Sequence, residues 1–264
     1  MSLWSLLLLP SAVFITGDHH ARRLPISEQP RPPNENRILS ALPREDYDRL
    51  APHLKPVSMP RGEVLYHTGA HIEYVYFPVK SMISLVSRMS DGANVEVGVT
   101  GFEGMVGLPF LLGSEKSPHE CMVQIPDGAL RARADVIKSE FKRGGALQDL
   151  LHRYTQSLLV MTSQAAACNR AHSVGERLAR WLLMTHDRCV SVDLPLTHEF
   201  LSMMLGTRRA GVTEAAIILQ AEGLIKYNRG HVTIEDRRGM EEFACECYGI
   251  IKAEFDLRPA EAFG

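Results

Sequence analysis

The sequence lacks most of the features that assign a chain to a narrow class. Its five cysteines are scattered over 264 residues, and none precedes Cys121. This excludes a disulfide framework and indicates reduced thiols in a cytoplasmic protein. The 29 basic residues do not exceed the 31 acidic ones, and the net charge is −2. A nucleic-acid-binding protein of this composition therefore needs a local basic patch.

Long hydrophobic runs are also absent. The N-terminal MSLWSLLLLPSAVFITG is apolar over about 15 residues, which is too short to span a bilayer, so no membrane partner is expected. No Lys or Arg precedes it, as one would in a signal peptide. A mis-assigned start or a disordered extension is favoured over a targeting signal, and residues 1–33 are excluded from the folded part.

Short β-rich runs separated by glycine turns occupy residues 57–136, after helical spacing that begins at Asn34. The pairs Asp91-Gly92 and Asp127-Gly128 are strong hairpin signals. Many short strands with frequent turns predict a small β-barrel or roll. No arrangement of its residues is typical of a catalytic site, so the chain is not expected to be an enzyme.

From Ala146 the apolar period becomes helical. A seam spaced 4, 3, 4, 3, 4 and 3 runs over three heptads. A stripe this narrow is typical of a coiled coil, so we expect a dimerisation helix. The alternative is a helix packed on its own domain. The seam consists of Leu147, Leu151, Tyr154, Leu158, Met161, Ala165 and Cys168.

The next helix is expected to start with a capping box, formed by Ser173 and Glu176. It is followed by two further helices that are joined by a tight turn. Thr197 is expected to cap the first helix, Gly206 to end it and Thr207 to cap the second. This is the spacing of a helix-turn-helix, whose second helix enters the major groove of DNA. Its inward residues are Val212, Ala215, Ala216, Leu219 and Leu224.

The run LIKY-NRG-HVTI then predicts a β-hairpin, which would form a wing beside the second helix. Its polar residues would lie near phosphates. The candidate DNA-binding residues are Thr197, Thr207, Arg208, Arg209, Gly211, Thr213, Glu214, Lys226, Arg229 and His231. Gly211 either lets the helix approach the DNA backbone or allows tight packing between helices.

This order of elements and the motif LTHEFLSMMLGTRRAGVTEAAIILQAEGLI resemble the Crp/Fnr family of bacterial transcription regulators. The resemblance covers residues 34–245, and ACECY after the wing is similar to an alphaproteobacterial subgroup. It implies an α+β fold, in which a cyclic-nucleotide-binding-like β-roll (a jelly roll), a long dimerisation helix and a C-terminal winged helix-turn-helix follow one another. It also implies a homodimer on two-fold-related half-sites of double-stranded DNA, with RNA polymerase as a further partner.

Two departures from the family pattern have consequences. Members that bind cyclic AMP read bases with two arginines and a glutamate, whereas the matching positions here hold Arg209, Ala210 and Glu214. Arg209 alone remains to pair with guanine O6 and N7. Cyclic-nucleotide pockets also need an arginine for the phosphate, and none occurs between Gly101 and Arg131. Cyclic nucleotide binding is therefore not expected, and the small-molecule effector is unknown. A collapsed pocket filled by Phe110, Leu111 and Leu112 is an alternative.

Other sensor chemistry has little support. The family's N-terminal iron–sulfur cysteines are absent, and the haem-ligand candidates His67, His71 and His119 are isolated. Cys245 and Cys247, beside Glu246, could bind a metal or report redox state. They supply only two of the four ligands of a zinc site, however, and residues two apart on a helix point to different faces. No metal and no cofactor are therefore predicted.

The predicted division is an extension at 1–33, a sensor roll at 34–145, a dimerisation helix at 146–170, a winged helix at 171–248 and a C-terminal tail at 249–264. The function expected is sequence-specific, homodimeric transcription regulation in the cytoplasm. An alternative is a sensor module whose winged helix contacts protein instead of DNA.

Overall fold

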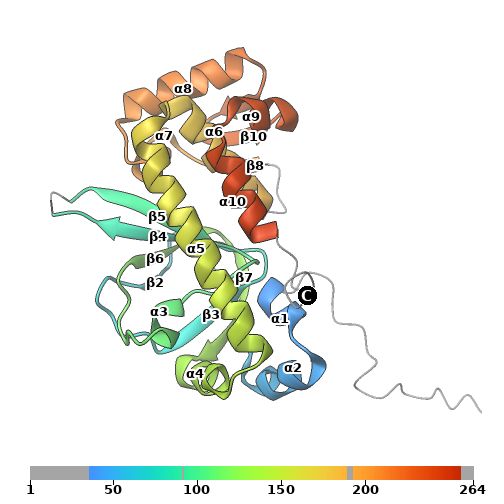
Figure 1. Cartoon of the computed structure of the whole chain (residues 1–264). Helices are drawn as coiled ribbons and strands as arrows, with labels where there is room; N and C mark the ends of the chain where they lie inside the picture. Colours follow the sequence, from blue (N-terminus) through green and yellow to red (C-terminus); the bar gives the residue numbers. More distant parts are fainter. Residues whose placement is uncertain (1–35, 91, 189–192, 257–264) are drawn as a thin grey trace, which may run out of the picture. The chain divides into compact units, whose positions relative to one another are not determined.

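The computed structural model describes residues 36–90, 92–188 and 193–256 (Figure 1). The predicted extension at residues 1–33 and the last part of the predicted tail, residues 257–264, lie outside these ranges. No helix in them combines the length and the apolar character that a membrane span requires.

The N-terminal part is a roll of two antiparallel sheets. One sheet has the order β1 (Lys55–Met59), β7 (Asp127–Arg133), β3 (Tyr74–Pro78). The other has the order β2 (Val64–Tyr66), β6 (Glu120–Ile125), β4 (Met82–Arg88), β5 (Asn94–Thr100). Phe77 and Ile83 are fully buried in the core of the roll. Helices α1 (Arg37–Ala41), α2 (Arg44–Leu50), α3 (Leu108–Leu111) and α4 (Ala134–Arg143), with a 3-10 turn at Ala51–His53, complete it.

One of the two predicted hairpins in the roll is confirmed. β4 and β5 pair directly, and Gly92 between them has a φ of +85°. The hairpin predicted at Asp127-Gly128 is wrong, because both residues lie inside β7 and pair with Met59 and Ser58 of β1. The chain instead changes sheets at this point, since β6 and β7 have no strand partner in common.

The long helix α5 (Ala146–Ala171) packs its apolar seam against its own chain. Leu147, Leu151, Tyr154, Met161 and Cys168 are at most 4 % exposed. Leu158 is half-buried beside the same cores, and Ala165 is also half-buried. The five buried residues are covered within their own chain and cannot also contact a second subunit, whereas for the half-buried Leu158 and Ala165 the predicted dimer contact stays a prediction. The heptad spacing reflects a helix that lies in a groove of its own protomer.

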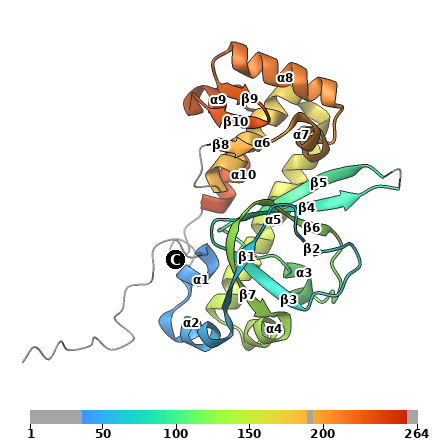
Figure 2. The same cartoon turned by 180° about the vertical axis from the view of Figure 1, so that it is seen from behind.

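The C-terminal part is a winged helix. Its elements are α6 (Val174–Arg188), β8 (Asp193–Pro195), α7 (His198–Leu205), α8 (Arg209–Ala221), β9 (Ile225–Asn228), β10 (His231–Ile234) and α9 (Arg237–Phe243). The three strands form one sheet in the order β8-β10-β9 (Figure 2). The capping box is confirmed, since Ser173 N donates to Glu176 Oε2 at 2.8 Å and Glu176 N donates to Ser173 Oγ at 3.3 Å.

The predicted C-terminal tail covers residues 249–264. Its described part, up to Asp256, belongs to a helix. α10 (Cys247–Asp256) runs back beside α5, as both views show (Figures 1 and 2). Its apolar stripe of Tyr248, Ile251 and Phe255 has helical spacing, and Tyr248 and Ile251 are buried. This helix therefore belongs to the folded protein.

Candidate DNA interface

The turn between α7 and α8 is built from local signals in the sequence. Thr197 caps α7, because its Oγ1 accepts a hydrogen bond from Phe200 N at 3.1 Å. Gly206 ends α7 with a φ of +57°, a conformation that glycine adopts without strain. A β-carbon at Gly206 would also approach Val95 to 3.2 Å. The helix-turn-helix geometry is as predicted.

The start of α8 differs by one residue from the prediction. The N-cap residue is Arg208, which makes no capping hydrogen bond, and Thr207 lies half-buried in the turn. Arg208, Arg209 and Ala210 are exposed at the beginning of the helix, and Glu214 is exposed one turn further. Val212, Ala215, Ala216 and Leu219 are buried as predicted, whereas Leu224 is buried beyond the helix end. The first turn of α8 thus presents two arginines outward.

Gly211 is not required by helix packing. A β-carbon there would meet Thr207 Oγ1 at 3.6 Å and Val174 Cγ2 at 3.8 Å, both ordinary contacts. The packing alternative for Gly211 is therefore wrong. The hydroxyl of Thr213 is engaged within the chain. It donates to Arg209 O at 3.0 Å, and its oxygen also lies 3.0 Å from His198 Nδ1. Its methyl group is what remains for an external contact.

The wing is a two-residue hairpin. Asn228 pairs with His231 across it, and the two loop residues have positive φ values, +48° for Arg229 and +83° for Gly230. This is the geometry of a type I′ turn. Lys226, Arg229 and His231 are exposed and line one concave surface of the wing.

His198, the first residue of α7, packs against Tyr227 of β9 with ring centroids 4.4 Å apart and the ring planes tilted by 36°. Burial lowers the pKa of His198, and the positive charge of Arg209 lowers it further. Its imidazole is therefore neutral at pH 7. Arginine and lysine side chains therefore supply the fixed positive charge of this face.

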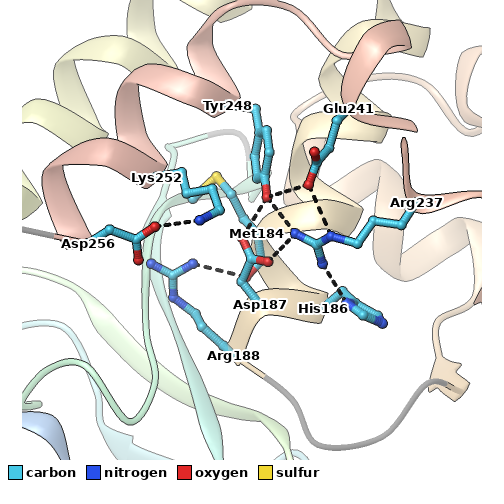
Figure 3. Close-up of polar contacts among 9 residues, drawn as sticks. All are labelled: Met184, His186, Asp187, Arg188, Arg237, Glu241, Tyr248, Lys252 and Asp256. Atoms are coloured by element: carbon cyan, nitrogen blue, oxygen red, sulfur yellow. Dashed lines mark hydrogen bonds and ion pairs between the residues drawn. The ribbon is translucent and has the colours of Figure 1, made fainter. Parts of the chain in front are cut away.

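A polar network holds the helices behind the wing (Figure 3). The Arg237 guanidinium donates to Asp187 Oδ1 at 2.6 Å and to Glu241 Oε1 at 3.0 Å. The hydroxyl of Tyr248 accepts from Arg237 at 2.7 Å and donates to Asp187 Oδ2 at 2.9 Å. These charged, part-buried hydrogen bonds connect α6, α9 and α10, and so join the winged helix to the helix that follows it.

Two acidic side chains of the roll contact α6. Arg188 Nε donates to Glu103 Oε1 at 2.7 Å, with both side chains at most 6 % exposed. Trp181 Nε1 donates to Glu96 Oε1 at 2.7 Å, while Glu96 Oε2 is buried without a hydrogen-bond partner among the described residues. Although the Glu96 residue as a whole is half-buried, its carboxyl group is enclosed, and this burial raises its pKa to about 7.

Glu96 is expected to make stability pH-dependent. Its folded-state pKa lies above the unfolded value, so the native state binds the extra proton between about pH 4.5 and 7. Its contribution is full below that window and is lost as the pH rises through 7. We expect Tm to fall by a few degrees between pH 5 and 8, and Glu96→Gln to flatten that part of the profile, measured by calorimetry. An unchanged profile in this variant would contradict the assignment.

The interior of the roll offers little for a cyclic nucleotide. Leu108 and Leu111 are buried in its core, but Leu112 is 54 % exposed, so the suggestion that Leu112 fills the pocket is wrong. The ring of Phe110 lies under Lys138 Nζ at 4.4 Å. Lys116 is the only lysine or arginine between Gly101 and Arg131, and it is exposed.

The histidine candidates for haem do not converge. His67 is exposed beside Glu120 at 3.1 Å, His71 is exposed, and His119 is half-buried with Nδ1 3.2 Å from Ser87 Oγ. One group that sequence reasoning missed does converge, since Cys168 and His172 lie beside Cys245 and Cys247. The signal was the spacing Cys-x-x-x-His at the end of α5.

Comparisons with known proteins match both halves of the chain. Residues 56–142 match the cyclic nucleotide-binding domain, and residues 176–243 match the Crp-like helix-turn-helix domain. A global nitrogen regulator of Nostoc sp. is 23 % identical over 183 residues, covering 66 % of this chain and 82 % of that protein. The structure of FixK2 from Bradyrhizobium japonicum superposes with a TM-score of 0.63 at 16 % identity, covering 73 % of this chain and 98 % of that one. The c-di-GMP-responsive global regulator CLP of Xanthomonas campestris superposes with a TM-score of 0.57 at 16 % identity, covering 73 % and 99 %.

Proposed function

We propose that the chain is a DNA-binding transcription regulator of the Crp/Fnr type, with α8 as its recognition helix and Arg209 as its main base-reading residue. The supporting observation is the exposure of Arg208 and Arg209 on the first turn of α8, directly after the left-handed turn at Gly206. An arginine at this place can donate two hydrogen bonds to guanine. Gly211 leaves room for the DNA backbone at the same end of the helix.

The remaining candidate residues are proposed to hold the duplex in register. Lys226, Arg229 and His231 of the wing face phosphates, as do Arg208 and the turn residues Thr197 and Thr207. Thr213 offers its methyl group to a base, and Glu214 either accepts from a cytosine amino group or repels phosphate. We propose, from the likeness to this family of regulators, that the protein acts in the cytoplasm and that RNA polymerase is a further partner. No enzymatic activity is proposed.

The test is selection of random DNA duplexes by the purified protein without added ligand. A two-fold-symmetric motif with half-sites one helical turn apart is expected. If no motif is enriched while binding is tight and salt-sensitive, base reading is absent. If DNA is not retained at all, the winged helix contacts protein, an alternative favoured by the exposure of Ile217 and Ile218 on α8, at 57 % and 49 %.

We further propose that the homodimer forms through the outward face of α5 rather than through the predicted seam. A second stripe on this helix is exposed and again has heptad spacing. Leu159, at 62 % exposure, is its most apolar member. The stripe consists of His152, Gln156, Leu159, Ser163, Ala166 and Arg170.

Leu159→Glu should separate the subunits. Two glutamates would meet across the two-fold axis, and a cost of at least about 3 kcal/mol weakens dimerisation roughly 100-fold. Sedimentation equilibrium should give a dimer for the wild type and a monomer for the variant at micromolar concentration. Leu112→Glu, at a similarly exposed leucine on the roll, is the matched control and should remain dimeric. A dimeric Leu159→Glu protein would place the interface elsewhere.

The sensor roll is proposed not to bind cyclic nucleotide, because Lys116 is exposed and no arginine lies in the corresponding stretch. We propose the functional division into a sensor roll at 34–145, a dimerisation helix at 146–170 and a DNA-binding domain from 171, extended through α10 to Asp256.

A further inference from the structure

Three cysteines and one histidine meet at the C-terminal end of α5. The ligand atoms of Cys168, His172, Cys245 and Cys247 all lie within 4.8 Å of one another. The three cysteines are at most 6 % exposed, and His172 is 17 % exposed. No part of the DNA interface uses these residues.

The backbone explains how they come together. Cys168 and His172 are four residues apart on one face of α5, where His172 is the C-cap and its N–H donates to Cys168 O at 3.1 Å. Cys245 and Cys247 are not on a common helix, because α9 ends with an extended residue at Ala244 and α10 begins at Cys247. The prediction that these two thiols face apart is therefore wrong: the break between the helices turns both toward α5.

The distances are those of ligands around one metal ion. A tetrahedral zinc ion, with bonds of about 2.3 Å to sulfur and about 2.0–2.1 Å to nitrogen, sets sulfur atoms roughly 3.8 Å apart and sulfur and nitrogen roughly 3.6 Å apart. Cys168 Sγ lies 3.5 Å from Cys245 Sγ, and Cys247 Sγ lies 3.6 Å from His172 Nδ1. The four protein ligands of an iron–sulfur cluster are divided over two or four iron atoms, so ligands on different irons stand farther apart than ligands of one ion.

The surroundings match the outer shell of a metal site. Nε2 of His172, the nitrogen turned away from the thiols, lies 3.2 Å from Glu246 Oε2. A carboxylate at this place orients a metal-binding imidazole and fixes its tautomer. Gln164 Nε2 donates to Cys247 Sγ at 3.2 Å.

Two buried arginines supply a charge that the cluster can balance. Arg177 and Arg180 are 8 % and 6 % exposed, and Nε of each is buried without a hydrogen-bond partner among the described residues. Both interact electrostatically with the Cys168 thiol. A divalent ion bound by three thiolates and a neutral imidazole carries a net charge of −1. Buried cations are favourable beside such a charge and costly without one.

We propose that Cys168, Cys245, Cys247 and Nδ1 of His172 bind one Zn²⁺ ion in a closed, structural site. Four protein ligands leave no position for a substrate, which distinguishes structural from catalytic zinc. On binding, the three thiols release their protons to solvent as thiolates. The ion joins the C-terminal end of α5 to the segment between α9 and α10. It thereby fixes the connection between α5 and α6, at which the DNA-binding domain begins.

The test uses the untagged full-length chain, purified under reducing conditions from cells supplied with zinc. Elemental analysis should find about one zinc per chain. Replacing zinc with Co²⁺ in the wild type should give the thiolate charge-transfer and ligand-field bands of a tetrahedral site. Cys247→Ser and His172→Ala should lose most of the metal, while Cys121→Ser, at a buried thiol inside the roll, should retain it. The cobalt spectrum needs no variant, so it decides the question even if these proteins fold poorly.

Three results would overturn the proposal. One is wild-type protein that stays without zinc after the reduced chain is incubated with zinc chloride. The second is full metal content in Cys247→Ser and His172→Ala. The third is that these cysteines are occupied by something other than zinc. This would be seen either as iron with acid-labile sulfide in the purified protein or as a Cys168–Cys245 disulfide in protein kept anaerobic. None of these results depends on DNA binding, so the function proposed above stands or falls separately.

Discussion

Replacing Arg209 with alanine is expected to abolish sequence preference while leaving weak binding to any duplex. Each bidentate arginine–guanine contact discriminates by about 1–3 kcal/mol, and a two-fold site contains two of them. The specific affinity should therefore fall by roughly 2–6 kcal/mol, which is about 30-fold to 10⁴-fold. The residual binding, which depends on phosphate contacts, should weaken steeply with salt.

The measurement is a titration of a selected operator and of a scrambled duplex at two salt concentrations. Arg238→Ala is the matched control, because Arg238 lies on α9 with its side chain 90 % exposed and forms an ion pair with Glu242, one turn further on the same helix, at 3.0 Å. It should leave the ratio of the two affinities unchanged. Equal ratios for wild type and Arg209→Ala would show that another residue reads the bases.

The largest loss of stability is expected from Arg188→Met. The variant leaves the carboxylate of Glu103 buried without its partner, and breaking one side of a buried ion pair costs about 3–5 kcal/mol. For a chain of this size that corresponds to a fall in Tm of roughly 6–20 °C. Arg188 also lies over the ring of Phe255 at 5.0 Å, so the loss extends to the packing of α10.

Urea unfolding of three proteins would test this prediction. Glu103→Leu combined with Arg188→Met removes both charges and should recover much of the lost stability. Lys252→Met breaks an exposed pair with Asp256 and should change the free energy of unfolding by less than about 1 kcal/mol. An Arg188→Met protein as stable as the wild type would mean that Glu103 is solvated in solution.

The helix-turn-helix and the wing were predictable because their determinants are local. Thr197 and Gly206 act on backbone groups within three residues of themselves, and the turn at Arg229-Gly230 needs only its own φ angles. The Asp127-Gly128 prediction failed for the opposite reason. Local turn propensity at these residues is overridden by their pairing with β1, which is made about 70 residues earlier in the chain.

The role of α5 was predicted only in part. The heptad seam correctly indicated a long helix with one narrow buried face, but spacing alone does not say which molecule covers it. The group of three cysteines and one histidine at the end of α5 could not be predicted from the sequence for a related reason. Cys168 and Cys245 are 77 residues apart, and only the return of α10 along α5 brings them together.

The position of α10 also sets an order of events during synthesis. The roll is complete at the end of α4, but roughly 110 further residues must be made before α10 can cover α5, which takes roughly 6–20 s of translation. During this interval the apolar stripe of α5 is open and two of the four proposed zinc ligands do not yet exist. A chain that stopped before α10 would leave this face of α5 uncovered and the proposed site with two ligands instead of four. Both the packing of α5 and the closure of the proposed site therefore wait for the synthesis of α10.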